Sequence, residues 1–262
     1  MIFADDMDVS VLYKSAALDL GIQWVGWAAA VAFSTEKFFD LAGSATYALV
    51  AYLSLQWGGG HFTRQKVQTT LVLIWAFRLG SYLFMRVLRE GKDVRFDEAK
   101  RNPAHFLVYW TLQAVWVFIT LLPTLILNAK SRDRVLGFQD YLGWFLWAVG
   151  ILLEAVADHQ KSVFKADPEN SGKFIQSGLW SISQHPNYLG EITLWLGLYI
   201  TAAGVMRGWE HISIVSPVFV AFLLLKVSGV PLLDELGMKR WGNNPGYLAY
   251  RERTAVLVPF VW

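Results

Sequence analysis

Seven apolar stretches recur along the 262-residue chain and leave little room for a soluble fold. A hydrocarbon core of about 30 Å is crossed by about 20 helical residues. Because lipid offers the backbone no hydrogen-bonding partner, such stretches cross a membrane as α-helices. We therefore predict an all-α integral membrane protein with seven transmembrane helices, at residues 18–33, 41–57, 67–88, 106–127, 141–157, 188–205 and 212–230.

Composition supports a membrane protein and excludes several other classes. Hydrophobic residues make up 55% of the chain and charged residues only 17%, against about a quarter in soluble domains. The chain has no cysteine, which excludes disulfides, thiolate metal sites and a cysteine nucleophile. A net charge of +2, without a basic run interleaved with aromatics, gives no reason to expect nucleic acid as a partner. Nothing in the sequence requires an obligate protein partner.

Charge distribution predicts the orientation. With the N-terminus outside, the inner segments hold about fifteen Lys and Arg residues and the outer segments about seven, as the positive-inside rule prefers. We predict an N-out, C-in multi-pass protein of the bacterial inner membrane, or of the endoplasmic reticulum in a eukaryote. The longest polar segments then face the cytoplasm, where nucleotide cofactors are available.

A charged stripe marks the end of the fifth stretch. Glu154, Asp158, Lys161 and Lys165 follow one another at spacings of four, three and four residues, so their side chains share one helical face. One interpretation is a salt-bridged helix end. Because Glu154 and Asp158 lie deep in an apolar stretch, where charge is costly, we favour a wall that contacts a polar, partly anionic ligand.

The segment from Ser183 to Glu191 reads SQHPNYLGE and combines several helix-start features. Pro186 suits the first turn of a helix, so His185 precedes the helix, and Asn187 and Glu191 stack one turn apart. The unpaired N–H groups of a helix N-terminus bind anions. The segment could be an interfacial cap with a lone histidine. The cost of an unpaired Glu191 within the membrane favours a ligand site for a carboxamide or a phosphate.

Two further segments carry charge with less specific meaning. The 89–98 loop, which includes Arg95, is best interpreted as a solvated cytoplasmic loop. The tail around Tyr250 and Arg251 either anchors at the membrane interface or covers an adenine and its phosphate. No GxGxxG, P-loop or HExxH motif is present. The spacing of His159 and His185 does not favour a metal site.

The heptapeptide HPNYLGE at residues 185–191 resembles the signature of the membrane steroid 5α-reductase superfamily. Residues 154–161, 226–234 and 250–259 are similar to other parts of that family, so the resemblance covers the C-terminal half. Two departures suggest a bacterial branch: Glu154 stands where the eukaryotic steroid enzymes usually have asparagine, and residues 228–231 replace a histidine-rich helix end.

The resemblance implies one membrane domain over residues 1–262, with substrate-chamber helices in 1–127 and cofactor-binding helices, loops and tail in 128–262. It implies NADPH as the cofactor, with Asp158 and Lys165 near the nucleotide and Asn187 and Glu191 at the nicotinamide end. On charge grounds Lys161 and Arg95 are candidates for the 2′-phosphate. The predicted cofactor-binding residues are Arg95, Glu154, Asp158, Lys161, Lys165, His185, Asn187, Tyr188, Glu191 and Tyr250.

The family polarises the substrate ketone with an acid–tyrosine pair from its early helices, and a donor in a dry pocket suits a developing enolate oxygen. The catalytic candidates here are Asp40 and Tyr82. Glu36, Tyr47 and Arg78 are open alternatives, and a helix-capping aspartate with a packed tyrosine is the plain structural reading.

The predicted function is NADPH-dependent reduction of the C=C bond of a lipid-soluble enone, such as a 3-oxo-4-ene steroid reduced to its 5α product. The first alternative is a membrane methyltransferase of the isoprenylcysteine or phospholipid type that uses S-adenosylmethionine. Glu191 is compatible with both. A transporter or lipid-binding scaffold is less favoured, because the sequence shows no repeat and the polar residues gather on one side.

Overall fold

A computed structural model describes residues 6–90, 96, 102–259 and 261. Within these residues the regular structure is helical, apart from two isolated β-bridges, Met7–Lys130 and Ser183–Ala255. The chain divides into two compact units. The first comprises Met1–Tyr141 and Tyr199–Ser216, and the second comprises Leu142–Leu198 and Pro217–Trp262.

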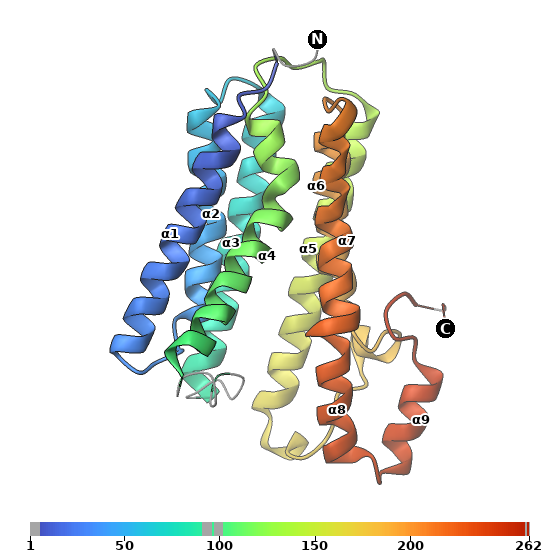
Figure 1. Ribbon diagram of the computed structural model, residues 1–262. Coiled ribbons are helices and arrows are strands. Elements are labelled where there is room, and N and C mark those ends of the chain that lie inside the picture. The colour runs from blue at the N-terminus through green and yellow to red at the C-terminus, as the bar shows by residue number, and fades with distance from the viewer. Residues whose placement is uncertain (1–5, 91–95, 97–101, 260, 262) are drawn as a thin grey trace. The chain divides into compact units, whose positions relative to one another are not determined.

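The first unit is built on a bundle of four helices, which lie side by side in Figure 1. A polar cap starts the last of them: the Asn102 side chain accepts hydrogen bonds from the backbone N–H groups of Ala104 and His105, and Pro103 occupies the first turn. The four helices are α1 (Ser10–Ala32), α2 (Phe39–Trp57), α3 (Thr63–Glu90) and α4 (Pro103–Asn128).

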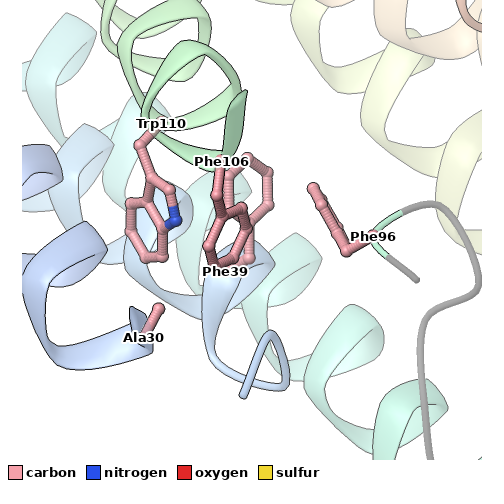
Figure 2. Packing of buried hydrophobic residues seen from close by; sticks show 5 residues of the cluster. All are labelled: Ala30, Phe39, Phe96, Phe106 and Trp110. Atoms are coloured by element: carbon pink, nitrogen blue, oxygen red, sulfur yellow. The ribbon is translucent and has the colours of Figure 1, made fainter. Parts of the chain in front are cut away.

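An aromatic cluster closes one end of this bundle (Figure 2). Phe39 of α2 lies 4.7 Å from Phe96 and 4.9 Å from Trp110 of α4, measured between ring centroids. Phe96 belongs to the 89–98 loop, which we interpreted as solvated, yet only 2% of this residue is exposed. The interpretation is therefore wrong for Phe96, because burying an aromatic ring outweighs leaving the segment in water. Arg95 lies outside the described residues.

Buried ion pairs hold the opposite ends of the first unit's helices. Arg64 of α3 donates to both carboxylate oxygens of Asp140, at 2.6 and 3.0 Å. Lys130 donates to Glu210 at 2.7 Å and to Asp6 at 3.2 Å. Both cations are almost completely buried, and Arg64 also pairs with Asp133, so losing all of its carboxylate partners would leave either cation as an uncompensated buried charge.

The second unit contains most of α5 (Phe138–Ala166), α6 (Pro186–Ala203) and α7 (Val215–Phe222). The π-helical turn η6 (Leu223–Val227) follows α7 and leads into α8 (Val230–Trp241) and α9 (Pro245–Arg253). Short 3₁₀ helices, η3 (Pro168–Asn170) and η4 (Gly178–Ser181), lie between α5 and α6. The helix η5 (Gly208–Ile214), between α6 and α7, belongs to the first unit.

Glycines bring α5 and α6 into backbone contact. A Cβ atom on Gly150 would lie 2.6 Å from the carbonyl oxygen of Gly190, and one on Gly190 would lie 2.6 Å from the backbone nitrogen of Glu154. Gly197 meets the backbone of Gly143 in the same way, two turns further along α6. We call these four glycines the glycine seam. Small residues permit this close helix packing in membrane proteins, and here they place Glu154 beside the start of α6.

All seven predicted segments coincide with helical structure, from α1 to the η5–α7–η6 run. Four helices among the described residues are long and apolar enough to cross a membrane: Thr63–Leu88, Pro103–Asn128, Phe138–Ala166 and Gly208–Trp241. The all-helical prediction is confirmed for the described residues, and these spans support a membrane protein. The seven-span count and the orientation stay predictions, as does the single-domain organisation.

Candidate functional site

Two predicted site residues meet where α5 passes the start of α6. The side-chain amide of Asn187 donates to Asp158 Oδ1 at 3.3 Å. Asn187 is in the first turn of α6, which begins at Pro186 as the sequence predicted. The Asn187 carbonyl oxygen, Oδ1, is buried and has no hydrogen-bond partner among the described residues. A buried polar atom without a partner is costly, so this oxygen is available to accept a hydrogen bond from a further group.

His185 supplies a second unpartnered atom at the same helix start. Its ring stacks on that of Tyr188, with centroids 5.2 Å apart and planes within 5°. The side chain is 5% exposed, and within the described part of the chain Nδ1 has no partner. Burial, together with the positive charges of Lys161 and Arg251, lowers the pKa of His185 to about 4. The imidazole is therefore neutral at pH 7, with one nitrogen as donor and the other as acceptor.

The charged stripe of α5 lies along the same region. Glu154 is buried beside the glycine seam, and Asp158 one turn later is buried against Asn187. The Lys161 ammonium lies 4.6 Å from the centroid of the Trp180 ring, a cation–π arrangement. Trp180 in turn donates to the backbone carbonyl of Ala157 at 3.1 Å. The stripe therefore forms one wall of a polar region, with Glu191 half-buried one turn after Asn187 on α6.

The C-terminal tail is fastened to the residues before α6. The Gln184 side chain donates to the backbone carbonyls of Arg251 and Thr254, at 3.1 and 2.6 Å. Ser183 donates to the carbonyl of Leu257 at 2.7 Å. Sequence analysis missed these two residues because their partners lie about 70 positions away and no local spacing indicates the contact.

Tyr250 links the tail to the 3₁₀ turn before α6. Its hydroxyl donates to the backbone carbonyl of Trp180 at 2.8 Å. Burial is the main cause that raises the pKa of Tyr250 to about 12, so the phenol stays protonated. Arg251 pairs with Asp234 of α8 at 2.9 Å. Tyr250 is thus an anchor of the tail within the second unit, whatever it contacts in a ligand complex.

Lys165, at the end of the stripe, lines a separate surface cavity of about 440 Å³. Arg240 and Trp241, the last residues of α8, line the same cavity. Trp241 donates its indole N–H to the carbonyl of Gly172 at 2.6 Å, which holds this end of α8 against the segment after α5. The cavity belongs to the second unit, as do the other described cofactor-binding candidates.

The predicted catalytic residues lie in the first unit. Asp40 is in the first turn of α2 and pairs with Arg86 of α3 at 3.2 Å. The guanidinium of Arg78 lies 5.8 Å from the centroid of the Tyr82 ring, so these two residues share a face of α3. The alternatives Glu36 and Tyr47 are both buried. The role of Asp40 and Tyr82 toward a substrate stays a prediction.

Comparison with known proteins identifies the family. The chain belongs to the family described as "Protein of unknown function (DUF1295)", which it matches over residues 26–254. That family is part of the steroid 5α-reductase-like membrane superfamily, so the resemblance is confirmed at the superfamily level. No solved structure matches the chain.

Two curated relatives share part of the sequence. The chain is 34% identical over 123 residues to a protein named "Probable O-methyltransferase ustE" from Ustilaginoidea virens, a region covering 45% of this chain and 40% of that protein. It is 28% identical over 168 residues to an uncharacterized protein of Schizosaccharomyces pombe, covering 53% of this chain and 48% of the relative. The chain thus spans less than half the length of either relative.

Proposed function

We propose that this protein is an NADPH-dependent membrane reductase that reduces the C=C bond of a lipid-soluble enone, with 3-oxo-4-ene steroids as the substrate class. The observation that supports the cofactor is the pair of unpartnered atoms at the start of α6, His185 Nδ1 and Asn187 Oδ1. A nicotinamide carboxamide offers two N–H donors and one acceptor. Asn187 Oδ1 and a neutral His185 are complementary to such an amide.

The residues of the site would orient the cofactor rather than perform its chemistry, since bound NADPH supplies the hydride. Asp158 fixes the Asn187 amide by accepting its N–H, and Asn187 Oδ1, which has no partner among the described residues, would accept from the cofactor. In the first unit, the Tyr82 hydroxyl would donate to the ketone oxygen as negative charge develops there. The Asp40–Arg86 ion pair would hold the acid of the pair in one position.

A second candidate is a membrane methyltransferase that uses S-adenosylmethionine. The observation that favours it is the relative named a probable O-methyltransferase, 34% identical over its matched region. The α-amino and carboxylate groups of S-adenosylmethionine could also engage His185 and Asn187, because one is a donor and the other an acceptor. The two candidates differ in the cofactor that stabilises the folded protein.

The test is thermal unfolding of the detergent-purified chain with NADPH, NADH or S-adenosylmethionine, since a ligand that binds the folded state raises its stability. We expect NADPH to give the largest shift, and the Asn187→Ala variant to lose it. Asn243→Ala, an exposed asparagine on the same unit, is the matched control. NADPH consumption with a 3-oxo-4-ene steroid then tests the reaction. Stabilisation by S-adenosylmethionine alone would replace the reductase with the methyltransferase.

A further inference from the structure

The buried face of α1 is polar, although much of its exposed face is apolar. Ser15, Asp19 and Gln23 follow one another at four-residue spacing, so their side chains share one face. At most 1% of each of these residues is exposed, whereas Tyr13 and Val25 of the same helix are open. Because α1 packs against α2 and α4 (Figure 1), the polar face lies inside the four-helix bundle. Polar groups buried there need partners.

The carboxylate of Asp19 is the group on this face that most needs a partner. Both of its oxygens are buried and have no hydrogen-bond partner among the described residues. Asp19 lies nine residues after Ser10, where α1 begins, which is about 14 Å along the helix axis. A buried carboxylate without a compensating charge is among the costliest groups that a fold can contain. The position therefore requires a cation or a proton.

The cationic side chains of the first unit that could compensate Asp19 are paired elsewhere. Arg64 and Lys130, the buried cations of the described residues, each form ion pairs with other carboxylates. Arg86 pairs with Asp40, in the first turn of α2. Within the part of the chain that the structure describes, no Lys or Arg side chain forms an ion pair with Asp19. A compensating charge must come from outside the chain.

Two neutral oxygens lie one helical turn from Asp19 on the same face. Ser15 Oγ and Gln23 Oε1 are both buried, and neither has a partner among the residues described. The Gln23 amide nitrogen donates to Thr46 Oγ1 at 3.0 Å, and the Thr46 hydroxyl donates to the carbonyl of Ala42 at 2.7 Å. Because Thr46 has no second proton to give, the unpartnered atom of Gln23 is its carbonyl oxygen. The face thus presents oxygen acceptors only.

We propose that this face binds a monovalent metal cation, Na⁺ or K⁺, with Asp19 as the anionic ligand and Ser15 and Gln23 as neutral oxygen donors from the neighbouring turns. Hard cations are held by oxygen ligands of these kinds. One carboxylate balances one positive charge, whereas a divalent ion would leave a net charge inside the bundle. The site is independent of the proposed reductase activity, because it involves neither the cofactor residues nor Tyr82.

Other occupants match these atoms less well. A proton would neutralise Asp19, but the hydroxyl of the acid would then need an acceptor, and the three side chains form no hydrogen bond with one another. A water molecule could bridge the oxygens but would leave the negative charge in place. A larger polar ligand would need an opening to the surface, and these side chains are almost completely covered. A small cation satisfies both the charge and the lack of space.

The experiment follows thermal unfolding of the detergent-purified full chain in NaCl, KCl or choline chloride at equal concentration. A ligand that binds the folded state stabilises it, so an alkali ion at ten times its Kd should raise the ratio of folded to unfolded protein about tenfold. Choline is too large for the site and should have no such effect. Equilibrium binding of ²²Na⁺, or of ⁸⁶Rb⁺ as a K⁺ analogue, should saturate at one ion per chain. Asp19→Asn keeps the shape of the side chain and should lose both effects.

Ser15→Ala tests the site without changing its charge, and it should weaken alkali-ion binding about tenfold by removing one ligand. Ser54→Ala is the matched control, because the Ser54 hydroxyl is buried in the same bundle but already bonds Ala51 and Asn128. It should lower stability and leave the alkali-ion response unchanged. Asp8→Asn removes an exposed carboxylate that caps the start of α1 and should also leave the response unchanged.

Four results would overturn the site. If NaCl and KCl raise Tm no more than choline chloride and no ion binds, Asp19 is a protonated acid. If Asp19→Asn keeps the alkali-ion response, the ion binds elsewhere. If CaCl₂ at equal ionic strength stabilises wild type more than either alkali salt, and Asp19→Asn abolishes that effect, the site is divalent. If Asp19→Asn does not accumulate in the membrane, Ser15→Ala decides, and unchanged ion affinity in that variant contradicts the proposal.

Discussion

The amide of Asn187, in the first turn of α6, donates to the carboxylate of Asp158 on α5 across 3.3 Å. This bond orients the asparagine so that one carbonyl oxygen remains buried without a partner. Two residues that are 29 positions apart in the sequence thereby form one structural element.

Asn187→Asp should weaken nucleotide binding more than Asn187→Ala, the variant that only removes the amide. It places a second carboxylate against Asp158 and removes the donor, so like charges would repel where a hydrogen bond now exists. We expect nucleotide affinity to fall by about ten- to a hundredfold, with membrane insertion retained. The measurement is Kd by fluorescence titration, and Asn243→Asp serves as the exposed control. Unchanged affinity would remove Asn187 from the cofactor site.

Because the His185 imidazole is buried, the folded protein should be less stable in mild acid than at pH 7. Burial lowers the pKa of His185 from 6.5 to about 4. Between these values the unfolded chain binds a proton on this imidazole and the folded chain does not, so stability falls as pH drops and the loss ends below pH 4. The full effect is about 3 kcal/mol. Thermal unfolding from pH 7 to pH 4 should show it, and His185→Gln should flatten the profile. His159→Gln, at an exposed position, should not.

Gly190→Ala should destabilise the second unit. The added Cβ would lie 2.6 Å from the backbone of both Glu154 and Gly150, and neither backbone can yield as a flexible side chain could. We expect a loss of about 1–3 kcal/mol and weaker nucleotide binding. Gly21→Ala in α1, where a Cβ meets nothing within 4 Å, is the matched control and should be neutral or stabilising. Equal stability of the two variants would contradict close packing at the seam.

Tyr82→Phe should slow the reaction without affecting the cofactor. The change removes one hydrogen-bond donor and little volume, so a donor to the enolate oxygen would be lost at a rate cost of about a hundredfold. Affinity for NADPH should stay the same. The measurement is the rate of NADPH consumption with a 3-oxo-4-ene steroid, alongside Tyr52→Phe on the exposed part of α2. An unchanged rate would exclude Tyr82 from the mechanism.

The predicted membrane orientation can be tested by labelling single introduced cysteines. The chain contains no cysteine of its own that would give background labelling. Ser177→Cys lies in the predicted cytoplasmic segment and Ser131→Cys in a predicted outer segment, and both positions are exposed. A membrane-impermeant maleimide added to intact spheroplasts should label Ser131→Cys alone. In inverted vesicles it should label Ser177→Cys alone. The reverse pattern would invert the topology.

Hydropathy predicted the helices because lipid-facing length and composition leave few alternatives. It ended the fifth segment at residue 157, whereas α5 continues to Ala166, because the last turns are polar although still helical. It also made residues 212–230 one span, where the structure has 3₁₀, α and π turns in succession. The apolar content of a segment indicates that the segment avoids water. It does not indicate whether the backbone hydrogen bonds follow a 3₁₀, α or π pattern.

The site was partly predictable for a similar reason. Helical spacing brought Asp158 and Lys161 to one face, and Pro186 indicated where α6 begins. The contacts that complete the site depend on distant residues. Gln184 bonds backbone carbonyls of the tail, and Trp241 bonds Gly172. A backbone carbonyl is the same for every residue type, so nothing in the sequence marks it as a partner.

The glycine seam has a consequence for how the polar residues stay in position. Because Gly150 and Gly190 each face the other's backbone, sliding one helix past the other by a residue would put a larger side chain into the contact. The two helices therefore pack against each other in a single register. The spacing between Asp158 and Asn187 is therefore set by contacts between glycines, which carry only a hydrogen atom in place of a side chain. A ligand then meets a preorganised pair, and little of its binding energy is needed to order these helices.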